Sequence, residues 1–204
     1  MKHLVLCFTA FLLIVQSIQA QSKKELSAML SRDLKDYRRF SLELKLDSCF
    51  RYMPPKMFDI IPFDSLKATM IQAMDNEYMS VQMTGFEFDS NKKHKLKKAG
   101  KYFWAFVSYS GSMQMILKGD DEFKKALVPL LKAQFGADNV QMEGSSTMHI
   151  ALRNKVLIAF KDPALPNWSM IEDKRAENGP DLEQQQALIK AIMPAEVLLA
   201  VDNK

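Results

Sequence analysis

YFWAFVSY, at residues 102–109, is apolar on both faces of an extended chain, and this stretch decides the fold class. Even positions from Tyr102 to Phe106 point to one face, and odd positions from Phe103 to Tyr109 point to the other. A strand of this kind is predicted to lie at the centre of a sheet, with other elements covering both of its sides.

The segments around this stretch predict an antiparallel sheet. Residues 79–83 alternate apolar with polar side chains, and the phase changes after Gly85, which predicts a bulge. Ser110-Gly111 is predicted to form a tight turn into an antiparallel strand over 112–117. Further strands follow downstream, and Arg153-Asn154 is predicted to be a hairpin turn between two of them. These strands are predicted over 139–143, 148–153, 155–161 and 168–173.

Apolar residues recur at helical spacing before and between these strands. Ser22 and Glu25 fit a capping box, and the apolar row from Leu26 to Phe40 predicts a long first helix. In the next stretch Leu42, Leu44 and Leu46 alternate as in a strand, but the lack of Gly, Pro or Asn between Phe40 and Met53 favours a second helix that ends at Pro54-Pro55. Further helices are predicted over 65–74, 119–135 and 181–192, with a short continuation to 201.

Helices first, then an antiparallel sheet interrupted by one helix, predict an α+β fold. We expect N-terminal helices packed on a curved antiparallel sheet, with a helix at the C-terminus. No internal repeat or long linker divides the sequence, so residues 21–204 are predicted to form a single domain.

The first twenty residues predict a cleavable secretory signal peptide. Lys2 and His3 precede the uncharged run 4–15, and a polar stretch then ends on Ala20. The uncharged run is shorter than the ~20 apolar residues that span a bilayer, so no transmembrane segment is expected after cleavage. The protein is therefore expected in the periplasm or outside the cell. Cys49 would then be its one remaining thiol, which leaves no intramolecular disulfide.

Composition narrows the classes of function. The chain has 28 Lys and Arg against 24 Asp and Glu, a balance too even for a dedicated nucleic-acid binder. The sequence has no Gly-rich phosphate loop and no nucleophile elbow, so no cofactor is predicted. His94 and His149 have no Cys or His at metal-ligand spacing, so no metal site is predicted.

The order of elements resembles a known superfamily. A long first helix runs into Arg51–Phe58, a short helix follows, and long strands end near Trp168. This order is similar to that of the nuclear-transport-factor-2-like, or cystatin-like cone, superfamily, and to small exported bacterial proteins of unassigned role that carry such a domain. The resemblance implies a curved sheet whose concave side encloses a cavity. In enzymes of that fold, the cavity often holds a carboxylate, a tyrosine or a histidine for proton transfer.

An apolar ligand pocket is the first candidate site. Its lining would come from the strands at 102–109 and 112–117, because aromatic rings and flexible thioethers suit an adaptable apolar ligand. The alternative is ordinary core packing between sheet and helices. The candidate pocket residues are Tyr102, Trp104, Phe106, Met113 and Met115.

A catalytic pair is the second candidate. Asp47, Tyr52 and Asp59 lie where the first helices are expected to meet the sheet. A buried aspartate could act as a general base while Tyr52 polarises a carbonyl, which would suit an isomerase or cyclase. The alternative is that these aspartates lie on the surface, where most aspartates are found.

A lysine-rich loop is the third candidate, since clustered lysines attract acidic lipid headgroups. The alternative is a solvated loop between two strands. The loop contains Lys92, Lys93, His94, Lys95, Lys97, Lys98 and Lys101.

Taken together, the sequence predicts a non-catalytic ligand-binding or interaction module with an apolar pocket. Its partner would be an apolar small molecule or another protein, and a homodimer is one alternative. An isomerase-type enzyme and a peripheral membrane protein that docks through the lysine loop are the other two hypotheses.

Overall fold

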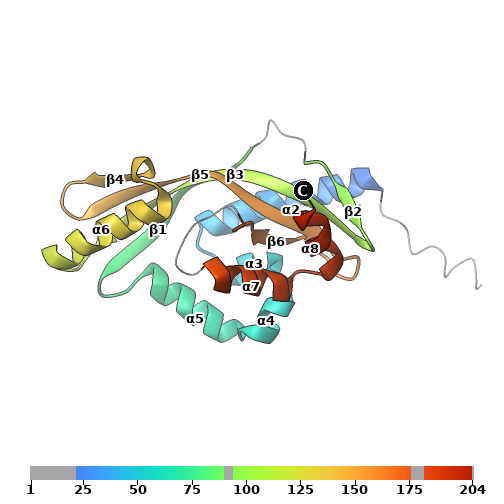
Figure 1. Cartoon of the computed structure of the whole chain (residues 1–204), viewed down its shortest axis with the longest axis horizontal. Helices are drawn as coiled ribbons and strands as arrows, with labels where there is room; N and C mark the ends of the chain where they lie inside the picture. The colour runs from blue at the N-terminus through green and yellow to red at the C-terminus, as the bar shows by residue number, and fades with distance from the viewer. Residues whose placement is uncertain (1–21, 90–93, 176–181, 204) are drawn as a thin grey trace, which may run out of the picture.

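The computed structural model describes residues 22–89, 94–175 and 182–203, which form an α+β fold (Figure 1). The predicted signal peptide lies outside these residues. The strands are β1 (Met79–Phe88), β2 (Lys97–Ala99), β3 (Tyr102–Leu117), β4 (Val140–Glu143), β5 (Thr147–Lys161) and β6 (Ser169–Glu172). The helices are α2 (Lys23–Leu42), α3 (Leu46–Cys49), α4 (Lys56–Ile60), α5 (Phe63–Met74), α6 (Asp121–Phe135), α7 (Leu182–Ile192) and α8 (Ala195–Asp202), with 3₁₀ turns at Phe50–Tyr52 and Ala137–Asn139.

The strands form one antiparallel sheet in the order β1-β3-β5-β4, with β2 paired to β3 and β6 paired to β5. The two long central strands, β3 and β5, run through the whole sheet (Figure 1). One half of the sheet, which we call the body end, contains β2 and β6. The other half, the far end, contains β4 and the first half of β1.

The predicted hairpin turns at Ser110-Gly111 and Arg153-Asn154 are wrong, because β3 and β5 are continuous through these positions. Arg153 and Asn154 together face Ser110, and Asn154 adopts the left-handed conformation with φ 54°. The turn-forming residues thus make a bulge that bends a paired strand. Gly111 fits the bend because a Cβ there would lie 2.8 Å from the carbonyl oxygen of Gly85.

The predicted bulge at Gly85 is confirmed, since the register of β1 shifts between Met83 and Gly85. Gly85 pairs with Ser112, so the irregularity in β1 lies beside the one between β3 and β5. Three neighbouring strands are therefore irregular along a single line across the sheet. This alignment accounts for the curvature that separates the body end from the far end (Figure 1).

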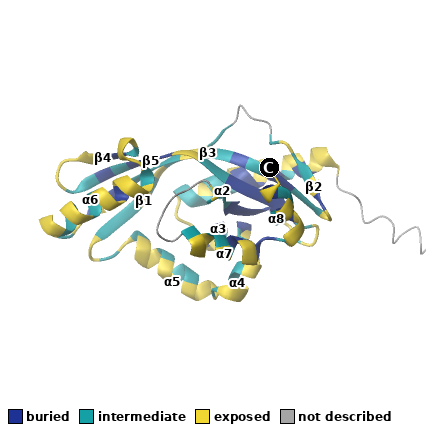
Figure 2. Cartoon of the chain, in the orientation of Figure 1, coloured by how far each residue is buried: buried dark blue, intermediate teal, exposed yellow. Residues whose placement is uncertain are grey.

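One face of the sheet is covered along its whole length. Odd-numbered side chains of β3 pack first with α2, at Ala105 and Val107, and then with α6, at Met115 and Leu117. On the opposite face, α7 and α8 cover Trp104 at the body end, as the continuous apolar pattern of 102–109 predicts (Figure 2).

At the far end, the face opposite α6 carries polar side chains. Gln82, Gln114, His149 and Gln141 lie opposite one another on four neighbouring strands. A polar face of this kind is usual for an antiparallel sheet with one side in water.

The first helix forms as predicted, with both hydrogen bonds of the capping box between Ser22 and Glu25. The predicted continuous helix over 42–53 is wrong, because α2 ends at Leu42 and only α3 and a 3₁₀ turn follow. Most later helices and strands lie where the sequence predicts them, apart from the two long strands. Helix α4 and strand β2 were not predicted, since β2 lies in the segment predicted as a loop, and α8 is a separate helix after Pro194. Residue 181, the predicted start of the last helix, lies outside the described residues.

Candidate functional site

The five predicted pocket residues belong to two separate clusters. Tyr102, Trp104 and Phe106 pack against α7 and α8, and Trp104 is only 1% exposed. Met113 and Met115 pack beneath α6 at the far end. None of the five lines a groove described below, so the structure shows them as parts of two packed layers.

The predicted catalytic residues do not meet at one point. Asp47 is exposed and its carboxylate lies 2.8 Å from the ammonium of Lys67. Asp59 is exposed on α4. Tyr52 is buried in the cluster beneath α2. Burial raises the pKa of the Tyr52 hydroxyl, and the carboxylates of Asp33 and Asp36 raise it further, so its acidic neighbours come from α2.

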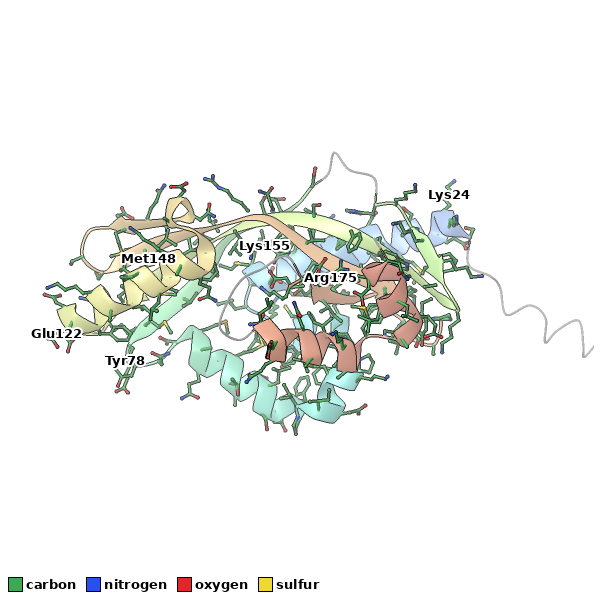
Figure 3. The ribbon with its side chains drawn as sticks, viewed as in Figure 1. Lys24, Tyr78, Glu122, Met148, Lys155 and Arg175 are labelled. Atoms are coloured by element: carbon green, nitrogen blue, oxygen red, sulfur yellow. The ribbon has the colours of Figure 1, made fainter. Side chains whose placement is uncertain are left out.

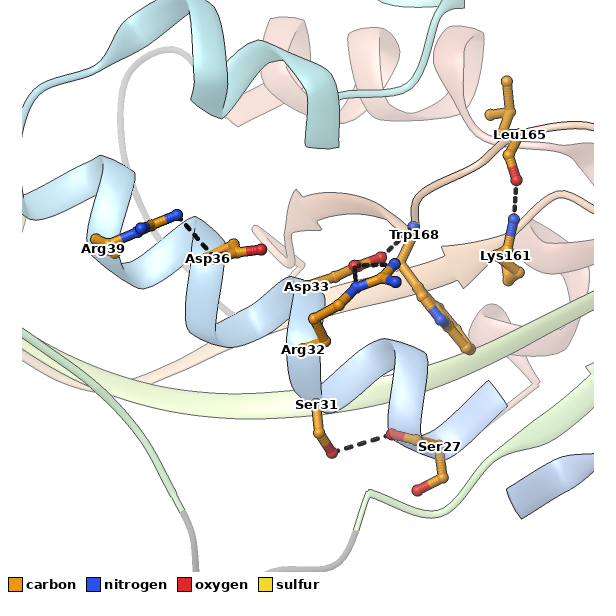
Figure 4. A network of polar contacts seen from close by, with 9 residues as sticks. All are labelled: Ser27, Ser31, Arg32, Asp33, Asp36, Arg39, Lys161, Leu165 and Trp168. Carbon is orange, nitrogen blue, oxygen red and sulfur yellow. Dashed lines mark hydrogen bonds and ion pairs between the residues drawn. The ribbon is translucent and has the colours of Figure 1, made fainter. Parts of the chain in front are cut away.

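A buried carboxylate outside the predicted site residues lies in α2. Asp33 is fully buried and accepts a hydrogen bond of 2.9 Å from the backbone N–H of Trp168 (Figure 4). Its other oxygen accepts from the guanidinium of Arg32 at 2.8 Å. The signal was present, because positions 26, 30, 33 and 37 form one helical row that is otherwise apolar.

Lys161 forms a second buried contact to the same loop. Its ammonium donates to the carbonyl oxygens of Asp162 and Leu165 (Figure 4). Burial lowers the pKa of Lys161, and the carboxylates of Asp33 and Asp162 oppose that shift. Asp33 and Lys161 therefore hold the loop that leads into β6, which is a structural role.

Cys49 is buried, with its Sγ 3.8 Å from the Oγ of Ser41. Burial raises the pKa of the thiol, which favours the unreactive protonated form.

The described lysines of the lysine loop do not all point to one surface. Lys92 and Lys93 lie outside the described residues, and Lys95 and Lys98 are exposed. Lys97 instead places its ammonium 4.8 Å from the centre of the Trp104 ring. The described part of the loop therefore contains one inward-facing lysine. Lys101 also lies over a ring, that of Tyr102, at 5.1 Å.

The end of α2 has an unusual residue at its cap. The backbone N–H of Lys45 bonds to the carbonyl of Phe40, and that of Leu44 bonds to Ser41. These are the two bonds of a Schellman motif, which usually has glycine at the left-handed position. Here that position is Leu44, with φ 52°. This cap ends the helix without the glycine signal, which explains why the sequence predicted a continuation.

The left-handed backbone of Leu44 places its side chain at a groove between α3 and α5. This α3–α5 groove has a volume of about 300 Å³. Leu44 is 40% exposed and Ile71 is 50% exposed. The groove is lined by Leu44, Lys45, Leu46, Asp47, Ser48, Lys67, Ile71 and Met74.

Helix α5 is amphipathic, yet none of its twelve residues is buried (Figure 2). Its N-terminal end is held by Phe63, whose ring contacts the buried ring of Phe50 at 5.0 Å between centroids. Farther along, Lys67 pairs with Asp47. The apolar row of α5 consists of Phe63, Leu66, Met70, Ile71 and Met74.

Comparison of the chain with protein-family models and with curated proteins finds no match. The resemblance to the nuclear-transport-factor-2-like superfamily therefore stays a prediction. Among the described residues, no helix has the length and apolar character needed to cross a membrane. Within the same residues, no three His, Cys, Asp or Glu side chains lie together as metal ligands would.

Proposed function

We propose that this protein is a non-catalytic interaction module that binds a protein partner through the α3–α5 groove. The observation that carries this proposal is Leu44. A left-handed backbone costs a non-glycine residue about 1–2 kcal/mol. Here the strained residue presents an apolar side chain to an open groove. Strain of this kind is often found at functional sites, and an apolar side chain on the strained residue of the α2 cap adds to that argument.

The apolar row of α5 also supports the α3–α5 groove as the binding site. An amphipathic helix in a stable domain normally buries its apolar face, but α5 leaves Ile71 half exposed beside Leu44. The charged rim of the groove is formed by Lys45, Asp47 and Lys67. We therefore expect the partner to insert one or two apolar side chains, with polar groups around them.

This proposal is favoured over the two pocket hypotheses. An isomerase would need an available aspartate beside Tyr52 inside a cavity. Asp47 and Asp59 are exposed, and the buried Asp33 already accepts hydrogen bonds from the Trp168 N–H and from Arg32. An apolar ligand would need open space beside Trp104, which packs against α7 and α8 instead.

Site-specific photocrosslinking in the producing cell tests the proposal. A crosslinking amino acid at Ile71 should give a discrete protein adduct, whereas the same amino acid at Ala126, on the exposed side of α6, should not. Light scattering after size-exclusion chromatography then distinguishes a second copy of the chain from a different protein.

Ile71→Asp and Thr69→Asp form a pair on one helix, because both positions are exposed and lie on different faces. Ile71→Asp should remove the complex and Thr69→Asp should leave it intact. Equal adducts from positions 71 and 126, or equal effects of the two aspartates, would overturn the proposal.

A further inference from the structure

The outward side of α2 is strongly basic. The helix contains six Lys and Arg residues against three acidic ones. Two of the acids are already engaged, since Asp33 is bonded to Arg32 and Asp36 is paired with Arg39. Lys24 and Lys35 are exposed and form no ion pair with any described residue. Lys24 projects outward from the first turn of the helix (Figure 3).

A shallow groove joins this helix to the lysine loop. It has a volume of about 950 Å³ and lies between α2, the end of β1 and His94. Lys24, Lys35 and Arg38 line it from α2, together with the hydroxyls of Ser27 and Ser31. The fold thus brings Lys24 and His94, seventy residues apart in the sequence, to one surface.

The acidic side chains of this groove are not free to oppose an anion. Glu87 pairs with Arg38, whose Nε also donates to the carbonyl of Phe86 at 2.6 Å. Asp89 interacts electrostatically with His94. Lys98 in β2 adds a further cation on this side, because it lies opposite Phe103, which packs in the cluster beneath α2.

We propose that this basic α2 surface, made of Lys24, Lys35 and Lys98, docks on an anionic lipid bilayer. Lys24 and Lys35 are eleven residues apart on one helix, which separates them by about 16 Å. One phosphate cannot contact both, whereas a sheet of headgroups presents negative charge along the whole distance.

The chemistry of the surface favours lipid over nucleic acid. Single-stranded nucleic acid needs aromatic faces on which bases stack. The aromatic residue that lines the groove, Phe88, instead packs against Phe86 with 5.0 Å between ring centroids. This inference concerns a different surface from the α3–α5 groove and stands independently of the proposed function.

Vesicle sedimentation of the full chain tests the inference, with phosphatidylcholine vesicles compared to vesicles that also contain phosphatidylglycerol. Lys24→Glu/Lys35→Glu reverses two charges on α2. Lys125→Glu/Lys132→Glu reverses two exposed charges on α6 and so has the same net charge. Because all variants share the apolar N-terminal stretch, its contribution to vesicle binding is the same in each.

The wild type should bind the phosphatidylglycerol vesicles more tightly than the neutral ones and should be released as salt rises. The α2 double variant should bind at least twenty-fold more weakly, since each lysine contributes about a five-fold factor. The α6 double variant should stay within about three-fold of the wild type. Circular dichroism confirms that both variants fold.

Three results would overturn the inference. Equal loss in both double variants would mean that net charge alone matters. Equal binding to neutral and anionic vesicles would mean that the basic surface has no role. Salt-sensitive binding to duplex DNA without binding to anionic vesicles would assign the surface to nucleic acid instead.

Discussion

Helices α2 and α5 are both amphipathic, but the rest of the chain buries the apolar face of α2 and leaves that of α5 exposed. Helix α2 buries Leu26, Leu30 and Leu34 completely, together with the carboxylate of Asp33. Helix α5 buries none of its residues. An apolar stripe therefore predicts that a helix face will be covered, but it does not say whether the cover belongs to the same chain.

The largest expected difference between the two helices is in core stability. Leu30→Ala should lower the free energy of unfolding by about 3 kcal/mol, because it leaves a cavity beneath α2. Ile71→Ala in α5 should cost less than about 1 kcal/mol, because half of that side chain is already in water. Urea unfolding of the two variants measures both values, and equal costs would show that α5 is part of the core.

A second comparison concerns the acidic residues of the two helices. Asp33→Ala should lower the free energy of unfolding by about 2–3 kcal/mol, because it leaves the backbone N–H of Trp168 buried without its acceptor. Asp64→Ala, at an exposed position in α5, should change it by about 0.5 kcal/mol or less. Thermal unfolding under identical conditions distinguishes them. A tolerated Asp33→Ala would contradict the anchoring role of Asp33.

The pH dependence of stability should also be set by α2. Burial raises the pKa of Tyr37, and the neighbouring Cys49 and Glu172 raise it further. A raised folded pKa gives stability that is present below the unfolded value of about 10 and is lost as pH rises above it.

The wild type should therefore lose stability above about pH 10, and Tyr37→Phe should flatten that loss by removing the ionisable group. Tyr78→Phe, which changes an exposed ring, should keep most of the alkaline loss. Chemical unfolding from pH 7 to 11 gives the two slopes. An unchanged slope in Tyr37→Phe would assign the alkaline loss to other groups.

The smallest expected effect is at Leu44, just after the end of α2. Leu44→Gly should be about 1 kcal/mol more stable than Leu44→Ala, because only glycine adopts the left-handed backbone without strain. In the middle of α5 the order should reverse, with Ala68→Gly losing about 1 kcal/mol. The midpoints of urea unfolding, compared between variants with equal m values, measure these differences in the free energy of unfolding. If alanine is the more stable residue at position 44, the backbone there is not left-handed.

The sequence predicts the fold class and most elements because each depends on local periodicity and capping. The capping box at Ser22 and the two-sided strand at 102–109 are signals of this kind. At Ser110-Gly111 and Arg153-Asn154 the sequence predicts hairpin turns, whereas the structure has a bulge within continuous strands. The same residue types favour a turn in a free chain and a bulge in a strand that is paired on both sides.

The candidate site was harder to predict, because its residues come together only through the packing of separate elements. Leu44 carries no sequence signal, since a leucine at a Schellman position differs from the usual glycine. Asp33 could have been found from its place in an apolar helical row. The lysine loop was visible, but its proximity to Lys24 and Lys35 depends on the packing of α2 beside β1.

The crosslinking yield at position 71 in a Leu44→Gly background tests whether the Leu44 side chain holds a partner in the α3–α5 groove. This variant keeps the cap of α2 and removes only the side chain that the strained backbone presents to the groove. We expect the adduct yield to fall at least five-fold relative to the wild-type background while the free energy of unfolding stays within about 1 kcal/mol. An unchanged adduct yield in a folded Leu44→Gly variant would show that the Leu44 side chain does not bind the partner.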